Sequence, residues 1–139
     1  MLLALVAAML VYSGLDPVAD RLTWVLETLP VMIGLLVLPL TYSRFPLTPL
    51  LYRLLALHAL ILIVGGHYTY AEVPLGNWAR DALELSRNHY DRLGHLAQGF
   101  VPAILTREIL LRRSPLGSGG WLFFIVACIC LAFSAFYEM

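Results

Sequence analysis

Five long apolar runs make up most of this chain, and only short polar stretches separate them. The runs cover residues 1–13, 22–42, 54–71, 89–111 and 121–139. A helix of about 20 residues crosses the ~30 Å hydrocarbon core of a bilayer and satisfies all of its own backbone polar groups there. The pattern therefore predicts an all-α fold, a polytopic transmembrane helical bundle of about five spans that forms one integral membrane domain.

The composition supports a membrane location and excludes one class of partner. Hydrophobic residues make up 60% of the chain, charged residues 13%, and the mean hydropathy is +0.81, whereas soluble domains average about 25% charged residues. The formal net charge is zero and the nine cationic residues are all arginines, scattered singly or in pairs, so we expect no nucleic-acid partner. Cys128 and Cys130 are two residues apart, so their side chains would point about 200° apart on a helix. They cannot pair and lack zinc-site spacing, so we expect packing or lipid-facing roles.

The apolar runs at the two ends of the sequence each allow a prediction. The first run is short for a span, but it lacks the basic start of a signal peptide, so we interpret it as a first helix. The last run is still apolar at Met139, and we expect the sequence to be truncated at its C-terminus.

The charges in the loops predict an orientation. Five arginines lie in the second and fourth loops with their adjoining helix ends, against four in the first and third loops with theirs, and arginine is enriched in cytoplasmic loops. This places the N-terminus in the cytoplasm and the 72–88 loop outside. That loop is predicted to carry a short amphipathic helix at the membrane interface, where Trp78 would be favourable.

Alternation of the spans brings many ionisable side chains to one membrane face. Ionisable groups in a span cost about 2.5–3.5 kcal/mol each on insertion scales, so they usually face a bundle interior and serve a function. The outer ends of the second to fifth spans contribute Glu27 and the six candidate site residues, which are His67, Glu72, His89, Asp91, His95 and Glu138.

Asp91 and His95 form the most specific pair in this set. They are four residues apart and therefore share a helical face. A carboxylate in that position can orient an imidazole, fix its tautomer and raise its basicity. This predicts a site that transfers protons or binds a metal.

A structural interpretation of the same stretch stays open. Asn88 can cap the fourth span, Asp91 can offset the helix dipole, and Arg87 and Arg92 can snorkel to headgroups. His95 would then be an interhelical hydrogen-bonding residue. His67 can meet water and headgroups at its helix end, and His58 is predicted to be a hydrogen-bonded core histidine.

Several motifs resemble the YjdF family of bacterial inner-membrane proteins. They are TYSRFPLT at 41–48, HYTYAEVPLG at 67–76, RNHYDRLGHLAQGF at 87–100, RE at 107–108 and the stretch LAFSAFYE ending at Glu138. The resemblance implies a polytopic protein of the bacterial inner (cytoplasmic) membrane with no established activity. It also implies that members continue past the glutamate matching Glu138 into an acidic-aromatic stretch and another span.

DRLGH at 91–95 is also loosely similar to the D-K-x-x-H start of a helix in VanZ-like membrane proteins, which are associated with glycopeptide resistance. That similarity favours a role on the envelope or on lipid-linked molecules.

Two functions from different classes follow. The first is an enzyme of the outer membrane face, in which the six site residues bind a metal or move protons on a lipid or lipid-linked substrate. Zinc, manganese or iron would suit these ligands, and the cofactor stays unknown. The second is a non-enzymatic membrane protein, an interaction subunit or a small carrier, in which the same residues form a relay or an interhelical network. Membrane lipids are the expected partners in both.

Overall fold

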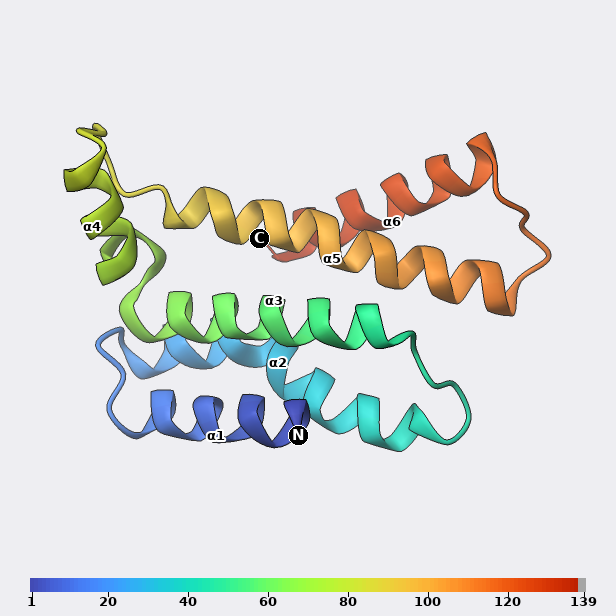
Figure 1. Cartoon of the computed structure of the whole chain (residues 1–139), viewed down its shortest axis with the longest axis horizontal. Helices are drawn as coiled ribbons and strands as arrows, with labels where there is room; N and C mark the ends of the chain where they lie inside the picture. Colours follow the sequence, from blue (N-terminus) through green and yellow to red (C-terminus); the bar gives the residue numbers. More distant parts are fainter. Residues whose placement is uncertain (138–139) are drawn as a thin grey trace. The chain divides into compact units, whose positions relative to one another are not determined.

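The computed structural model describes residues 1–137, and all regular structure within them is helical. The predicted all-α class is therefore confirmed. The elements are the helices α1 (Leu2–Leu15), α2 (Arg21–Tyr42) and α3 (Pro49–Tyr68), the short 3-10 helix η1 (Tyr70–Glu72), and the helices α4 (Pro74–Ala82), α5 (Tyr90–Arg113) and α6 (Gly120–Tyr137), as labelled in Figure 1.

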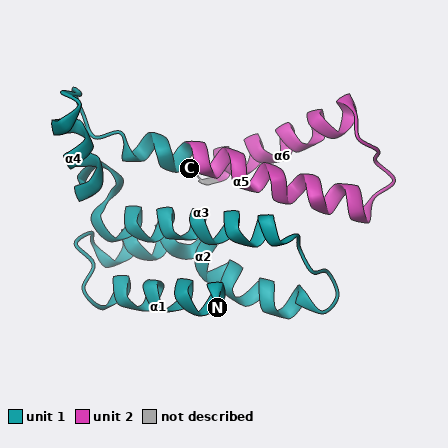
Figure 2. Cartoon of the chain, viewed as in Figure 1, with its two compact units in different colours: residues 1–95 teal, residues 96–139 magenta. Residues whose placement is uncertain are grey.

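The described chain separates into two compact units, residues 1–95 and the remainder from Leu96 onward, and the boundary falls inside α5 (Figure 2). In the first unit, α1, α2 and α3 lie side by side (Figure 1). Val6 of α1, Val31 of α2, and Leu62 and Ile63 of α3 form a buried apolar cluster between them. The prediction that the chain is a single domain stays a prediction.

Helices α2 and α3 are long and apolar enough to cross a membrane. The core helix of a soluble protein would be mostly buried, but only 11% of the most apolar stretch of α2 is buried inside the protein. The outward face of α2 instead carries a continuous aliphatic stripe that suits contact with lipid. The stripe consists of Leu22, Leu26, Leu29, Ile33, Leu36 and Leu40.

The remaining apolar helices, α1 and α6, are shorter. Helix α5 carries acidic and basic residues at both ends. Near its C-terminal end, which lies in the second unit, Arg112 pairs with Glu108 at 2.6 Å. Whether these three helices are membrane spans, as the sequence predicts, stays a prediction.

Helix α3 begins at Pro49, earlier than the predicted start at residue 54. Proline is favoured at the first helical position because its missing N–H has no intrahelical partner there. The hydroxyl of Thr48 accepts a hydrogen bond from the Leu51 amide and caps the helix. Helix α3 therefore begins directly after its capping residue, and Arg53 lies inside the helix.

Asp20 caps α2 in the same way, and its cap has a pH dependence. Its carboxylate accepts hydrogen bonds from the Thr23 hydroxyl and from the amides of Thr23 and Leu22. These bonds, led by that of the Thr23 hydroxyl, lower the pKa of Asp20. Since the folded pKa lies below the unfolded value of 3.8, the stabilising contribution is complete above pH 3.8 and is lost as the pH falls through the folded pKa.

An Asp20→Asn variant is expected to retain the cap but to lose this pH dependence. Its melting temperature in detergent should match that of the wild type at pH 7 and fall less steeply than that of the wild type on acidification below pH 4. Parallel curves for the two proteins over that range would contradict the assignment. Thr48→Ala, which removes a cap that does not titrate, provides the control for general loss of capping.

Candidate functional site

The site lies where the C-terminal end of α3 meets η1, α4 and the first turns of α5, all within the first unit. Tyr90, the first residue of α5, is buried and donates a hydrogen bond from its hydroxyl to the backbone carbonyl of Ile61 in α3, at 3.1 Å. The start of α5 is therefore held against α3, and the convergence of these residues at one membrane face stays a prediction.

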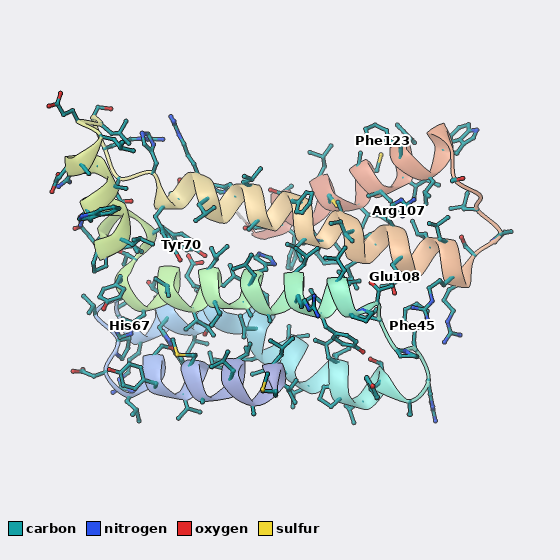
Figure 3. The ribbon with its side chains drawn as sticks, viewed as in Figure 1. Phe45, His67, Tyr70, Arg107, Glu108 and Phe123 are labelled. Atoms are coloured by element: carbon teal, nitrogen blue, oxygen red, sulfur yellow. The ribbon has the colours of Figure 1, made fainter. Side chains whose placement is uncertain are left out.

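Tyr70 of η1 fits between two glycines. A Cβ atom on Gly65 of α3 would lie 2.5 Å from the Tyr70 ring, and one on Gly94 of α5 would lie 2.7 Å from it. Figure 3 shows Tyr70 between α3 and the start of α5. The Tyr90 ring lies next to it, with the ring centroids 6.0 Å apart. Only residues without a side chain at 65 and 94 leave room for this ring.

His67 holds the same end of α3 to the other two helices of the bundle. Its Nδ1 lies 2.9 Å from the Ser13 carbonyl oxygen at the end of α1. Because a carbonyl can only accept a hydrogen bond, Nδ1 must carry the proton. The His67 carbonyl accepts a hydrogen bond from the Ala19 amide, just before α2. In this structure the predicted site residue His67 makes a contact between helices.

Asn88 organises the segment between α4 and α5. Its Oδ1 accepts a hydrogen bond from the Tyr90 amide, so the predicted cap of this helix is confirmed. Its Nδ2 donates to the Val73 carbonyl and to Oδ1 of Asn77, both at 3.0 Å. A Cβ on Gly76 would lie 1.9 Å from Oδ1 of Asn88, so Gly76 permits this close approach.

Replacing Asn88 by alanine is expected to release α4. The variant loses all three of these hydrogen bonds, each worth about 0.5–1.5 kcal/mol, so amide exchange across residues 73–88 should accelerate by at least tenfold. Asn88→Asp keeps the acceptor for Tyr90 but loses the Nδ2 donor, and it should accelerate exchange in α4 while leaving the first turn of α5 protected. Unchanged exchange in α4 in both variants would contradict the anchoring role.

Asp91 and His95 come together as the spacing predicts. Asp91 Oδ1 lies 3.4 Å from His95 Nε2, and both side chains are about half exposed, at 52% and 53%. The pair is therefore accessible to water or to a ligand. A carboxylate in this position favours a proton on Nε2 of the imidazole.

A cleft of about 550 Å³ opens beside this pair. Its volume lies within the range of small-molecule sites, roughly 300–1,000 Å³. Its lining comes from α4 and from the chain on either side of it, and includes Thr69, Tyr70, Arg80, Arg87 and Asp91. Thr69 adopts a φ of 63°, a region that a β-branched residue rarely occupies, and such strain, about 1–3 kcal/mol, is often found at functional sites.

Among the described residues, Glu72 and His89 have other surroundings than the Asp91–His95 pair. Glu72 is exposed in η1 and acts through its charge on Arg80, whose pKa is raised by the Asp81 hydrogen bond first and then by the charges of Asp81 and Glu72. The Nδ1 atom of His89 is buried and makes no hydrogen bond to any described residue. Glu138 lies outside the described residues.

Two further observations bear on the sequence predictions. Among residues 1–137, no three His, Cys, Asp or Glu side chains lie close enough to share a metal ion. His58 is partly buried as predicted, but the prediction of a hydrogen-bonded ring is wrong for Nε2, which is buried and finds no partner within the described chain. The apolar neighbours along α3 offer it no acceptor or donor.

The sequence prediction missed Tyr70 and the anchoring role of Asn88. Both act through contacts between segments distant in sequence, which helical periodicity cannot detect. The available signal was the set of glycines at 65, 76 and 94, since a glycine inside a helix often marks a close approach of another group.

Comparisons with known proteins agree with the fold. A family model described as "Predicted membrane protein (DUF2238)" matches residues 1–139. The inner membrane protein YjdF of Escherichia coli (strain K12) is 51% identical over 130 residues, which are 94% of this chain and 62% of the relative. The chain therefore spans about three fifths of the length of that relative.

No solved structure matches the chain, and the looser similarity to VanZ-like proteins stays a prediction. The resemblance to YjdF is confirmed, and the chain belongs to the DUF2238 family of predicted membrane proteins.

Proposed function

We propose that this protein resides in the bacterial inner membrane and transfers protons on a lipid or envelope substrate, with Asp91 and His95 as the acid-base pair. The single observation that carries the proposal is that Asp91 lines the cleft and lies 3.4 Å from His95. The inner-membrane location rests on the name and similarity of the E. coli relative.

The chemistry of the pair supports proton transfer. An imidazole can take up and release a proton, and a carboxylate beside it, as Asp91 is beside His95, stabilises the protonated form. A second carboxylate or imidazole close enough to complete a metal site is lacking in residues 1–137. The proposal therefore rests on acid-base chemistry and requires no metal.

A second function has its own support. His67, Asn88 and Tyr90 all use their polar groups to join segments of the first unit. A non-enzymatic role, as an interaction subunit or a small carrier, would extend this structural use to Asp91 and His95. The two candidates differ in what they require of that pair, since only the enzyme requires its proton transfer.

The test uses the purified protein in nanodiscs made from bacterial polar lipids, followed over time by lipid mass spectrometry. We expect one lipid species to decline in the presence of the wild-type protein and to persist in empty nanodiscs. A lipid composition that stays constant for hours around well-folded protein would contradict the enzymatic proposal and favour the structural one.

A further inference from the structure

Helix α4 is amphipathic, and the side chains of its apolar face are exposed. Leu75 and Trp78 are three residues apart and therefore share one side of the helix, and they are 64% and 68% exposed. Asn77, on another side, contacts Asn88. An exposed apolar face that contains tryptophan is typical of a helix lying in the membrane interface, with its apolar side in the acyl-chain boundary.

With α4 in the membrane interface, the cleft beside it lies at the level of the lipid headgroups. Arg80 lies about 140–160° around the helix from the apolar face, by the 100° turn per residue, and lines the cleft. Arg87, beyond the end of α4, lines it as well. The cleft is therefore next to an interfacial helix and carries two cations.

The two arginines have donors left for a ligand. Arg80 gives its Nε hydrogen to Asp81 at 2.8 Å, which leaves its terminal nitrogens. Arg87 forms no hydrogen bond or ion pair with any residue of the described chain. Guanidinium groups bind phosphate oxygens in a planar, two-point geometry that few other groups can match.

The charges around the cleft point to Arg87 as the contact for an anion. Arg80 and Arg87 supply two positive charges to the lining and Asp91 supplies one negative charge. Asp81 and Glu72 offset the charge of Arg80, whereas no ion pair offsets that of Arg87 within the described chain. A phosphodiester headgroup carries a single negative charge. Seated against Arg87, it would also come within reach of Asp91, which the proposed acid-base function requires.

We propose that the cleft binds the phosphate of a membrane phospholipid headgroup, with Arg87 as the main contact and Arg80 as the second. This inference rests on the proposed function, because it names the substrate class for the same site. Binding alone can be measured without turnover, so the two proposals can fail separately.

The test is native mass spectrometry of the delipidated protein titrated with phosphatidylglycerol, with diacylglycerol of the same acyl chains as the phosphate-free comparison. We expect phosphatidylglycerol to bind selectively, and Arg87→Gln to weaken its binding by at least about tenfold, as loss of a charge-assisted hydrogen bond predicts. Arg92→Gln provides the matched control, because Arg92 is exposed on α5 but does not line the cleft. It should change affinity less than twofold.

Three outcomes would overturn the inference. Equal losses in Arg87→Gln and Arg92→Gln would indicate general electrostatic attraction to the membrane surface. Equal binding of diacylglycerol would exclude recognition of the phosphate. Displacement of the lipid by millimolar glycerol 3-phosphate would assign the site to a soluble phosphate ester. Asp91→Asn should keep lipid binding, because Asp91 is not a proposed phosphate contact. If the wild-type protein binds the lipid but does not turn it over, only the proposed function is overturned.

Discussion

Replacing Asp91 by asparagine or His95 by glutamine is expected to lower the rate of lipid turnover by about 10²- to 10⁴-fold, the usual contribution of a general acid or base. Asparagine is nearly the same size as aspartate but carries no charge to stabilise a protonated imidazole. Glutamine retains polarity at position 95 but cannot take up a proton. Both variants should therefore fail at the same step, and the double variant should be hardly slower than either single one.

Folding is not expected to confound this result. Both side chains are about half exposed and their contact is 3.4 Å long, and surface substitutions of this kind usually change stability by less than about 0.5 kcal/mol. Melting temperatures in detergent should therefore stay within a few degrees of the wild type. Arg92→Gln, one residue from Asp91, should retain full turnover. Variants that unfold, or that keep wild-type rates, would remove the acid-base assignment.

Gly65→Ala adds only one methyl group, but it should strongly lower the stability of the folded protein. The added Cβ would lie 2.5 Å from the Tyr70 ring, so the ring must move away from α3 and toward Gly94. Overpacking of this kind costs about 1–3 kcal/mol. The melting temperature should fall by several degrees, and the cleft that Tyr70 lines should lose ligand affinity.

The matched control is the same substitution at Gly34 of α2. A Cβ there would have no neighbour within 4 Å, and alanine favours the helix by up to about 1 kcal/mol over glycine. Gly34→Ala should therefore leave the melting temperature unchanged or raise it. Adding Tyr70→Ala to Gly65→Ala should recover part of the loss, because the clash disappears with the ring. Equal effects at positions 65 and 34 would show that Tyr70 is not held between the glycines.

Much of this fold could be predicted because membrane helices depend on local rules. Apolar length predicted the helical segments, and the four-residue spacing brought Asp91 and His95 together. The early start of α3 was missed because hydropathy set the boundary at Arg53, although Thr48 and Pro49 form a helix start that does not depend on hydropathy.

The candidate site could be predicted only in part, for a physical reason. A hydrogen bond such as that of Asn88 to Val73, or a ring between Gly65 and Gly94, depends on which segments meet after the helices have packed. A single sequence marks such positions only through small residues and polar residues without an evident local role. The different roles of His67 and His95 could not be predicted for the same reason. The folded structure is needed to show that His67 contacts a backbone carbonyl, whereas His95 contacts a carboxylate.

The hydrogen bond between His67 and the Ser13 carbonyl has a consequence for how the two histidines can be used. An imidazole that donates through Nδ1 keeps that hydrogen whether or not its other nitrogen takes up a proton. The link between α1 and α3 therefore does not depend on that second nitrogen, whereas the pair of His95 with Asp91 is an ion pair only when His95 is protonated. The contact that holds the bundle together is therefore separate from the pair that the proposed proton transfer uses.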